Sequence, residues 1–173
     1  MRIIAGEWKG RRLQAPPGRG TRPTLDRVRE AWMSIIGPAI PDSRVLDLYA
    51  GTGALGLELL SRGAAHATFV ESDPKVRRVL EANITALEAR ERCTIERGDA
   101  LAFVRRTATA ARLYDIVCAD PPYATAGAVT IATTWLDAPF ASILGVEHDP
   151  RTTLPPGGET RRYGDTAITF YRE

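Results

Sequence analysis

Between residues 44 and 136 the sequence alternates short apolar runs with segments of helical periodicity. The apolar runs predict strands, and the periodic segments predict helices. Strands that alternate with helices form a parallel sheet, because each helix carries the chain back to the edge where the previous strand began. The pattern therefore predicts an α/β fold. The predicted strands are residues 44–49, 67–71, 93–96 and 113–119, and the predicted helices are residues 54–62, 74–89, 100–107 and 127–136.

The beginning of the chain departs from this alternation. Residues 3–5 and 12–14 have the pattern of two short strands, which predicts a β-hairpin. A helix is expected over residues 25–36, with Thr24 as its cap. Its apolar residues recur at helical spacing and predict one buried stripe.

The end of the chain departs from it as well. Residues 142–147 predict a fifth strand. Residues 161–163 and 167–171 are joined by Gly164-Asp165, a turn signal that predicts an antiparallel hairpin at the C-terminus.

The net charge of +2 hides an asymmetry along the chain. Residues 1–30 contain eight basic and three acidic residues, so this stretch carries +5 and the remainder carries −3. A basic end on a mildly acidic body suggests a polyanionic partner. We expect residues 1–24 to be a basic extension and residues 25–173 to form the α/β domain. The residues expected to contact the polyanion are Arg11, Arg12, Arg22, Pro23, Thr24, Arg27 and Arg29.

Composition excludes several classes of protein. Cys93 and Cys118 both fall in predicted strands and are too few for a disulfide framework. His66 and His148 stand apart, so we expect no metal site. No apolar run approaches a membrane span, and the first residues lack the apolar core of a signal peptide. We therefore expect a cytoplasmic protein without a membrane partner.

A glycine-rich turn follows the first predicted core strand and opens a helix. Gly51, Gly53 and Gly56 have the G-x-G-x-x-G spacing, and Glu71 lies 20 residues after the first of them, at the end of the next strand. This is also the dinucleotide fingerprint, in which the acid binds ribose hydroxyls. NAD is therefore one candidate cofactor.

Three features favour S-adenosylmethionine (AdoMet) over NAD. Asp47 ends the first strand, where it would repel a pyrophosphate but can face a cationic amino acid. Asp99 follows the third strand, where it can accept a hydrogen bond from an adenine amine or cap a helix. An acidic loop follows the fourth strand, and doubly wound sheets bind ligands at these strand ends. The expected cofactor-binding residues are Asp47, Tyr49, Gly51, Gly53, Glu71, Ser72, Asp99 and Ala100.

The acidic loop is Asp120-Pro121-Pro122-Tyr123, directly after the apolar run 113–119. Each proline fixes its own φ and extends the residue before it, so the loop is stiff. The Asp120 carboxylate and the Pro121 carbonyl can accept the hydrogens of a planar amine, while Tyr123 stacks on its face. We expect these four residues to be catalytic.

At this point the sequence resembles the RsmD family, the 16S rRNA guanine-N2 methyltransferases. The resemblance covers nearly the whole chain. It implies a Rossmann-like class I AdoMet-dependent methyltransferase fold, with a mostly parallel seven-stranded sheet, a C-terminal antiparallel hairpin and an N-terminal β-hairpin extension. It also implies that the polyanion is 16S rRNA, in a partly assembled small subunit. The segments that carry the resemblance are residues 2–6, 21–24, 26–30, 47–58, 61–64 and 120–123.

The sequence departs from the family at two places. Residues 31–34 read Ala-Trp-Met-Ser where relatives tend to show a Leu-Phe-Asn pattern, and the C-terminal region is short. The residues alone also leave alternatives open: a DNA adenine or cytosine amino-methyltransferase, a protein-glutamine methyltransferase, or an RNA-binding module without activity. The short chain shows no second target-recognition domain for DNA, and we expect a monomer.

Overall fold

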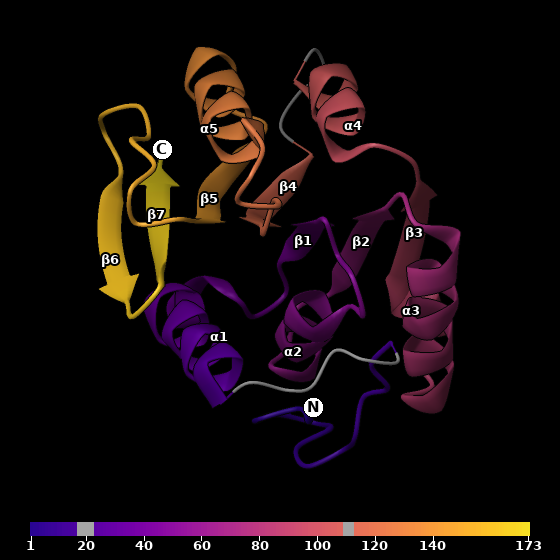
Figure 1. The fold of residues 1–173 in the computed structure, drawn as a ribbon. Coiled ribbons are helices and arrows are strands. Elements are labelled where there is room, and N and C mark those ends of the chain that lie inside the picture. Colours follow the sequence, from indigo (N-terminus) through magenta and orange to yellow (C-terminus); the bar gives the residue numbers. More distant parts are fainter. Residues whose placement is uncertain (17–22, 109–112) are drawn as a thin grey trace.

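The computed structural model describes residues 1–16, 23–108 and 113–173, with the backbone alone for residues 23–25. Seven strands form one sheet in the order β3-β2-β1-β4-β5-β7-β6 (Figure 1). The first five strands pair in parallel, and β7 pairs antiparallel to both of its neighbours. The strands are β1 Arg44–Leu48, β2 His66–Glu71, β3 Cys93–Arg97, β4 Tyr114–Ala119, β5 Ala141–His148, β6 Glu159–Tyr163 and β7 Thr166–Arg172.

Helices cover both faces of the sheet (Figure 1). Helices α1, α2 and α3 contribute to one hydrophobic cluster, and α4 and α5 contribute to another on the opposite face. The central strands β1, β2 and β4 are mostly buried, as expected for a parallel sheet, whereas the edge strand β3 is partly exposed. The helices are α1 Pro23–Ile36, η1 Gly37–Ala39, α2 Ala54–Ser61, α3 Pro74–Ala86, η2 Arg90–Arg92, α4 Ala100–Thr107 and α5 Gly127–Asp137.

Two predicted helix boundaries are wrong. Helix α1 begins at Pro23, so Thr24 lies in its first turn and is not the cap. Proline suits that turn because its fixed φ is helical and its missing N–H has no partner to lose. Helix α3 ends at Ala86 rather than Ala89, because Glu88 has a φ of +56°, which the right-handed helix does not allow.

The N-terminal extension packs into the same core as the α/β body. Ile3, Trp8 and Leu13 are buried within the cluster that contains α1 and α2. The predicted hairpin is present as a single antiparallel bridge between Arg2 and Arg12, without regular strands. The extension is therefore held by its side chains and by the polar contacts described below.

The parallel strands place their carboxyl ends at one edge of the sheet. Asp47 pairs in register with Phe69 of β2 and Cys118 of β4, so the loops after these strands emerge together. The predicted functional loops all begin at this edge, which is where doubly wound sheets bind ligands. Within the described residues, no helix combines the length and apolar character needed to cross a membrane.

Candidate active site

The glycine turn brings the start of α2 against the end of β1. The Gly56 N–H donates to the Asp47 carboxylate at 2.9 Å. A Cβ added to Gly56 would lie 3.0 Å from that carboxylate oxygen and 2.4 Å from the ring of Phe69. Gly51 and Gly53 have φ values of +58° and +81°, which glycine adopts readily. The turn therefore needs glycine for its conformation and for its close contact with Asp47.

Asp47 is a buried carboxyl close to two other acids. Burial raises its pKa to about 8, the Gly56 hydrogen bond opposes that shift, and the charges of Asp120 and Glu71 add to it. The structure therefore brings together three acids that the sequence predicts for the site. A cation placed beside them would favour ionised Asp47, so this group of acids fits a positively charged cofactor.

Glu71 lies half-buried at the end of β2. Its carboxylate accepts the Gly51 N–H at 2.9 Å and the Asp73 N–H at 2.8 Å, which fixes its orientation beside the glycine turn. Ser72 is exposed next to it. Each carboxylate oxygen can accept a further hydrogen bond, so Glu71 keeps the capacity to bind ribose hydroxyls.

Asp99 is the N-cap of α4, where its carboxylate accepts the Ala102 N–H at 2.8 Å. The capping role considered from the sequence is therefore confirmed, and it leaves the second carboxylate oxygen outside this bond. Ala100 is buried in the first turn of the same helix. An adenine contact from Asp99 stays a prediction.

Tyr49, in the loop after β1, packs against the loop after β4. Its pKa is raised by burial and then by the charge of Asp99, so its phenol lies within reach of that carboxylate's field. A Cβ added to Gly127 at the start of α5 would lie 3.0 Å from the Tyr49 hydroxyl oxygen and 2.9 Å from Pro121. Tyr49, Pro121 and Gly127 are thus packed together, with no room for a larger residue at Gly127.

The Asp-Pro-Pro-Tyr loop presents Asp120 and Tyr123 to solvent. Pro121 is buried, and the Pro122 carbonyl accepts the Thr125 N–H at 3.0 Å and its hydroxyl at 2.8 Å. The Tyr123 side chain is 44% exposed, yet its hydroxyl donates to Glu147 at 3.2 Å and contacts Thr166. The ring is therefore accessible but held at its hydroxyl end.

Sequence reasoning missed Asn83, which joins the N-terminal extension to the glycine turn. Its amide accepts the Gln14 N–H at 2.7 Å and donates to the Gln14 carbonyl at 3.1 Å and the Thr52 carbonyl at 3.0 Å. Asn83 is only 1% exposed. A polar residue among the apolar residues of the α3 stripe was the available signal, because a buried amide needs partners.

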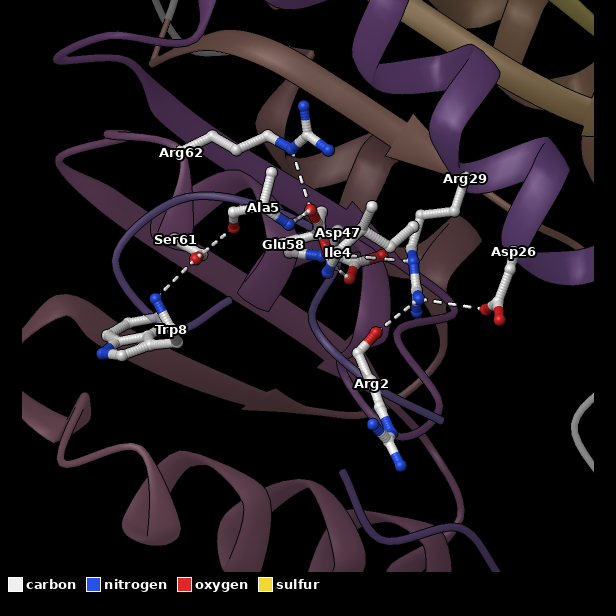
Figure 2. A network of polar contacts seen from close by, with 11 residues as sticks. Arg2, Ile4, Ala5, Trp8, Asp26, Arg29, Asp47, Glu58, Ser61 and Arg62 are labelled. Atoms are coloured by element: carbon white, nitrogen blue, oxygen red, sulfur yellow. Dashed lines mark hydrogen bonds and ion pairs between the residues drawn. The ribbon is translucent and has the colours of Figure 1, made fainter. Parts of the chain in front are cut away.

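A second missed residue, Glu58 of α2, fastens the extension from the other side (Figure 2). Its fully buried carboxylate accepts the N–H groups of Ile4 at 2.8 Å and Ala5 at 3.0 Å. It also pairs with Arg62 at 2.8 Å and lies 3.9 Å from Arg29. We call Glu58, Arg29, Arg62 and the backbone of residues 4–5 the N-terminal clamp.

Arg29 belongs to this clamp and not to the surface. It is 6% exposed, and it donates to the Arg2 carbonyl at 2.6 Å and to Asp26 at 3.0 Å (Figure 2). Burial lowers its pKa, while Glu58 and Asp26 oppose that shift. The sequence predicts Arg29 as a polyanion contact, and its burial corrects that prediction, because the guanidinium is turned inward to hold the extension.

The other basic residues have different positions. Arg11, Arg12 and Arg27 are exposed, and Arg11 donates to the Ala86 carbonyl at 2.5 Å. Arg22 lies outside the described residues, as do the side chains of Pro23 and Thr24. Among the described residues, no group of three His, Cys, Asp or Glu side chains is arranged to hold a metal ion.

Comparison with known proteins places the chain in a family. The family model described as conserved hypothetical protein 95 matches residues 1–172. The ribosomal RNA small subunit methyltransferase D of Haemophilus influenzae is 33% identical, over 99% of this chain and 92% of that protein. The Escherichia coli protein of the same name is 43% identical, over 71% of this chain and 60% of its own length.

The fold agrees with that relationship. The solved structure of the Escherichia coli protein yhhF is 34% identical, with a TM-score of 0.83, over 100% of this chain and 97% of that one. The predicted fold, a seven-stranded class I methyltransferase sheet with a C-terminal antiparallel hairpin, is confirmed. The chain therefore belongs to the conserved hypothetical protein 95 family, the RsmD family of ribosomal RNA small subunit methyltransferases.

Proposed function

We propose that this protein transfers a methyl group from AdoMet to the exocyclic N2 amine of one guanine in bacterial 16S rRNA. The observation that carries the proposal is the position of the Asp-Pro-Pro-Tyr loop. Asp120 follows β4 directly, and its charge acts on Asp47 at the neighbouring strand end. A loop with acceptors for an amine therefore adjoins the group of acids that fits a cationic cofactor.

The residues for the cofactor follow from the same edge. Asp47, Glu71 and Asp99 would hold AdoMet, with Tyr49 and the glycine turn around it. When bound, AdoMet supplies an electrophilic methyl group on a cationic sulfur. Glu71 and Asp99 are already oriented by backbone N–H groups, so they need little rearrangement to accept ligand hydrogens.

The target amine receives its help from the Asp-Pro-Pro-Tyr loop. The N2 lone pair of guanine is delocalised into the ring, so the amine is a poor nucleophile. Acceptance of its two hydrogens by the Asp120 carboxylate and the Pro121 carbonyl concentrates electron density on nitrogen. Positioning and fixed electrostatics then provide most of the rate enhancement. The proton that leaves nitrogen passes to Asp120 or to water.

The base must leave its stack to reach this loop. The exposed face of Tyr123 replaces part of the stacking that the base loses. RNA loops provide such splayed bases at less cost than a duplex does. The relatives named for the small subunit and the exposed arginines Arg11, Arg12 and Arg27 support rRNA as the substrate.

The finer features of the proposal rest on the resemblance for the substrate, and on the composition and length of the chain for the compartment and the monomeric state. The substrate is a partly assembled small subunit, and the enzyme acts as a monomer in the bacterial cytoplasm. The purified protein should be incubated with tritiated AdoMet and, separately, naked 16S rRNA, small-subunit particles, DNA and ribosomal protein. Label in a guanine of 16S rRNA supports the proposal, and label in DNA alone would replace it with a DNA amino-methyltransferase.

A further inference from the structure

A buried carboxylate lies behind the hydroxyl of Tyr123. Glu147 is the penultimate residue of β5 and is 9% exposed. It accepts the Thr166 hydroxyl at 2.9 Å and the Tyr123 hydroxyl at 3.2 Å. Tyr123 and Thr166 also contact each other through their hydroxyls, so each of the three side chains contacts the other two.

This group joins the active-site loop to the antiparallel end of the sheet. Thr166 begins β7, which pairs with β5 next to Glu147 (Figure 1). The other hydrogen bonds described for residues 121–127 stay within the loop and α5. Those of Tyr123 reach across to β5 and β7, so they set the position of the ring relative to the sheet.

The chemistry of the group keeps the ring in place. Burial raises the pKa of Tyr123, so the phenol stays protonated and donates. Burial also raises the pKa of Glu147, and the hydroxyls of Thr166 and Tyr123 oppose that shift. A carboxylate that accepts two hydroxyls has strong, directional bonds in a place where water is largely excluded.

We propose that Glu147, together with Thr166, is a positioning residue for methyl transfer, which holds Tyr123 by its hydroxyl and so fixes the Asp-Pro-Pro-Tyr loop against the target base. This inference rests on the proposed function, because it assigns how the same loop is oriented. Glu147 acts through Tyr123 and does not touch the reacting atoms. It follows that the Tyr123 hydroxyl contributes to turnover even though the ring alone provides the stacking surface.

The matched variants are Thr166→Val and Thr169→Val. Both threonines are buried on β7, but the Thr169 hydroxyl contacts His148 and Thr160 instead of Tyr123. The two variants remove the same atoms from the same strand. We expect Thr166→Val to lower the single-turnover methylation rate at saturating AdoMet by about 10- to 100-fold, since misplacement by about 1 Å has such effects. Thr169→Val should retain the wild-type rate.

The role of Glu147 is tested with one variant that keeps an acceptor oxygen and one that removes it. Glu147→Gln keeps an oxygen that can accept the Tyr123 hydroxyl, so it should retain more of the rate than Glu147→Leu. Tyr123→Phe removes the donor from the same bond. Combining Tyr123→Phe with Thr166→Val should therefore slow the reaction no further than the slower single variant does. AdoMet affinity should stay within about twofold of the wild type in every variant, as expected for sites without a shared partner.

Two kinetic outcomes would overturn the inference: wild-type rates for Thr166→Val and Tyr123→Phe, or equal slowing by Thr166→Val and Thr169→Val. Fluorine NMR of protein labelled with 3-fluorotyrosine separates this inference from the proposed function. Loss of the Thr166 hydroxyl in Thr166→Val should move the Tyr123 ring and so shift its fluorine resonance. That resonance is assigned by its absence in Tyr123→Phe. If the wild-type protein transfers no labelled methyl group to RNA, the proposed function is rejected. If the Tyr123 resonance does not move in Thr166→Val, the positioning role of Glu147 and Thr166 is rejected.

Discussion

Two regions of the molecule contain buried carboxylates, and the hydrogen-bond partners of these carboxylates differ between the two regions. In the N-terminal clamp, Glu58 faces two guanidinium groups and two backbone amides. At the carboxyl edge of the sheet, Asp47 has a backbone amide and Glu147 has hydroxyls. We call Asp47 and Glu147 the edge carboxyls. The edge carboxyls have raised pKa values with burial as the main cause.

The different partners indicate different roles for the two regions. The buried charge of Glu58 joins two segments through guanidinium and backbone amide partners, and removal of one partner from such a group is strongly destabilising. A buried carboxyl with neutral partners is a standing cost to folding. Such a cost is typical of functional sites, where a ligand or a positioned side chain uses the group. We therefore infer that the clamp serves the structure, and we propose that the edge carboxyls serve the reaction.

The largest expected effect comes from breaking the clamp. Glu58→Ala leaves Arg29 buried beside the open N–H groups of Ile4 and Ala5. Removal of one partner from a buried ion pair costs about 3–5 kcal/mol, so the free energy of unfolding should fall by that amount. Urea unfolding followed by circular dichroism measures it. A loss below about 1 kcal/mol, typical of an exposed pair, would show that the clamp is not a buried network.

The edge carboxyls should respond to pH. The pKa of Asp47 is about 8 in the folded protein and 3.8 in its ordinary state, so the folded state binds the proton more tightly. Stability from this group is fully present below about pH 4 and is lost as the pH rises through about 8. Asp47→Asn cannot ionise and should flatten that decline. Urea midpoints across this window test it, and parallel curves for the two proteins would contradict it.

Cofactor binding should release a proton through the same residue. A bound cation favours ionised Asp47, so AdoMet binding near neutral pH should expel up to about one proton from the wild type. Calorimetry in two buffers of different ionisation enthalpy measures this release. Asp47→Asn should bind more weakly and release less. Equal release from both proteins would place the titrating group elsewhere.

Smaller effects are expected at Arg27 and Arg29, which lie two residues apart in sequence but differ in exposure. Arg27 is exposed, so Arg27→Ala should weaken RNA binding and lower the salt slope by about one unit, without loss of stability. Arg29 is buried in the clamp, so Arg29→Ala should mainly lower the free energy of unfolding and should affect RNA binding less. Filter binding at several salt concentrations and urea unfolding give the two readouts. An unchanged salt slope for Arg27→Ala would remove this residue from the proposed surface.

The fold was largely predictable because local patterns determine it. Each predicted strand from residue 44 onward is present, with boundaries that differ by at most two residues. The errors lie where a single residue decides the boundary, as at Pro23 and Glu88. The predicted hairpin strands of the extension are reduced to one bridge with a few backbone hydrogen bonds, because the N–H groups of Ile4 and Ala5 donate to Glu58 instead of to the opposite arm.

Only those residues of the site that belong to a sequence motif were predictable. The glycine turn, Glu71, Asp99 and the Asp-Pro-Pro-Tyr loop follow strand ends, so their shared edge followed from the alternation. Glu58, Asn83 and Glu147 carry no motif. Apart from the Glu58–Arg62 pair within one helix turn, the hydrogen-bond partners of these residues are 19 to 69 residues away in sequence, so only the tertiary structure reveals them. Arg29 was misassigned for the same reason, because charge in a sequence does not reveal burial.

Single-turnover methylation of 16S rRNA, or of small-subunit particles, by Asp120→Ala at saturating AdoMet is the most direct test of the proposed role of the Asp-Pro-Pro-Tyr loop. Asp120 is exposed at the edge, and the proposed cofactor contacts come from Asp47, Glu71 and Asp99, so the variant should fold and lose only a small part of its AdoMet affinity. Loss of a preorganised partner of this kind should lower the rate by about 10²–10³-fold, with a smaller change in RNA affinity. Asp120→Asn keeps one acceptor oxygen and should retain part of the rate. Near-wild-type turnover by Asp120→Ala would contradict the role of the Asp-Pro-Pro-Tyr loop in methyl transfer.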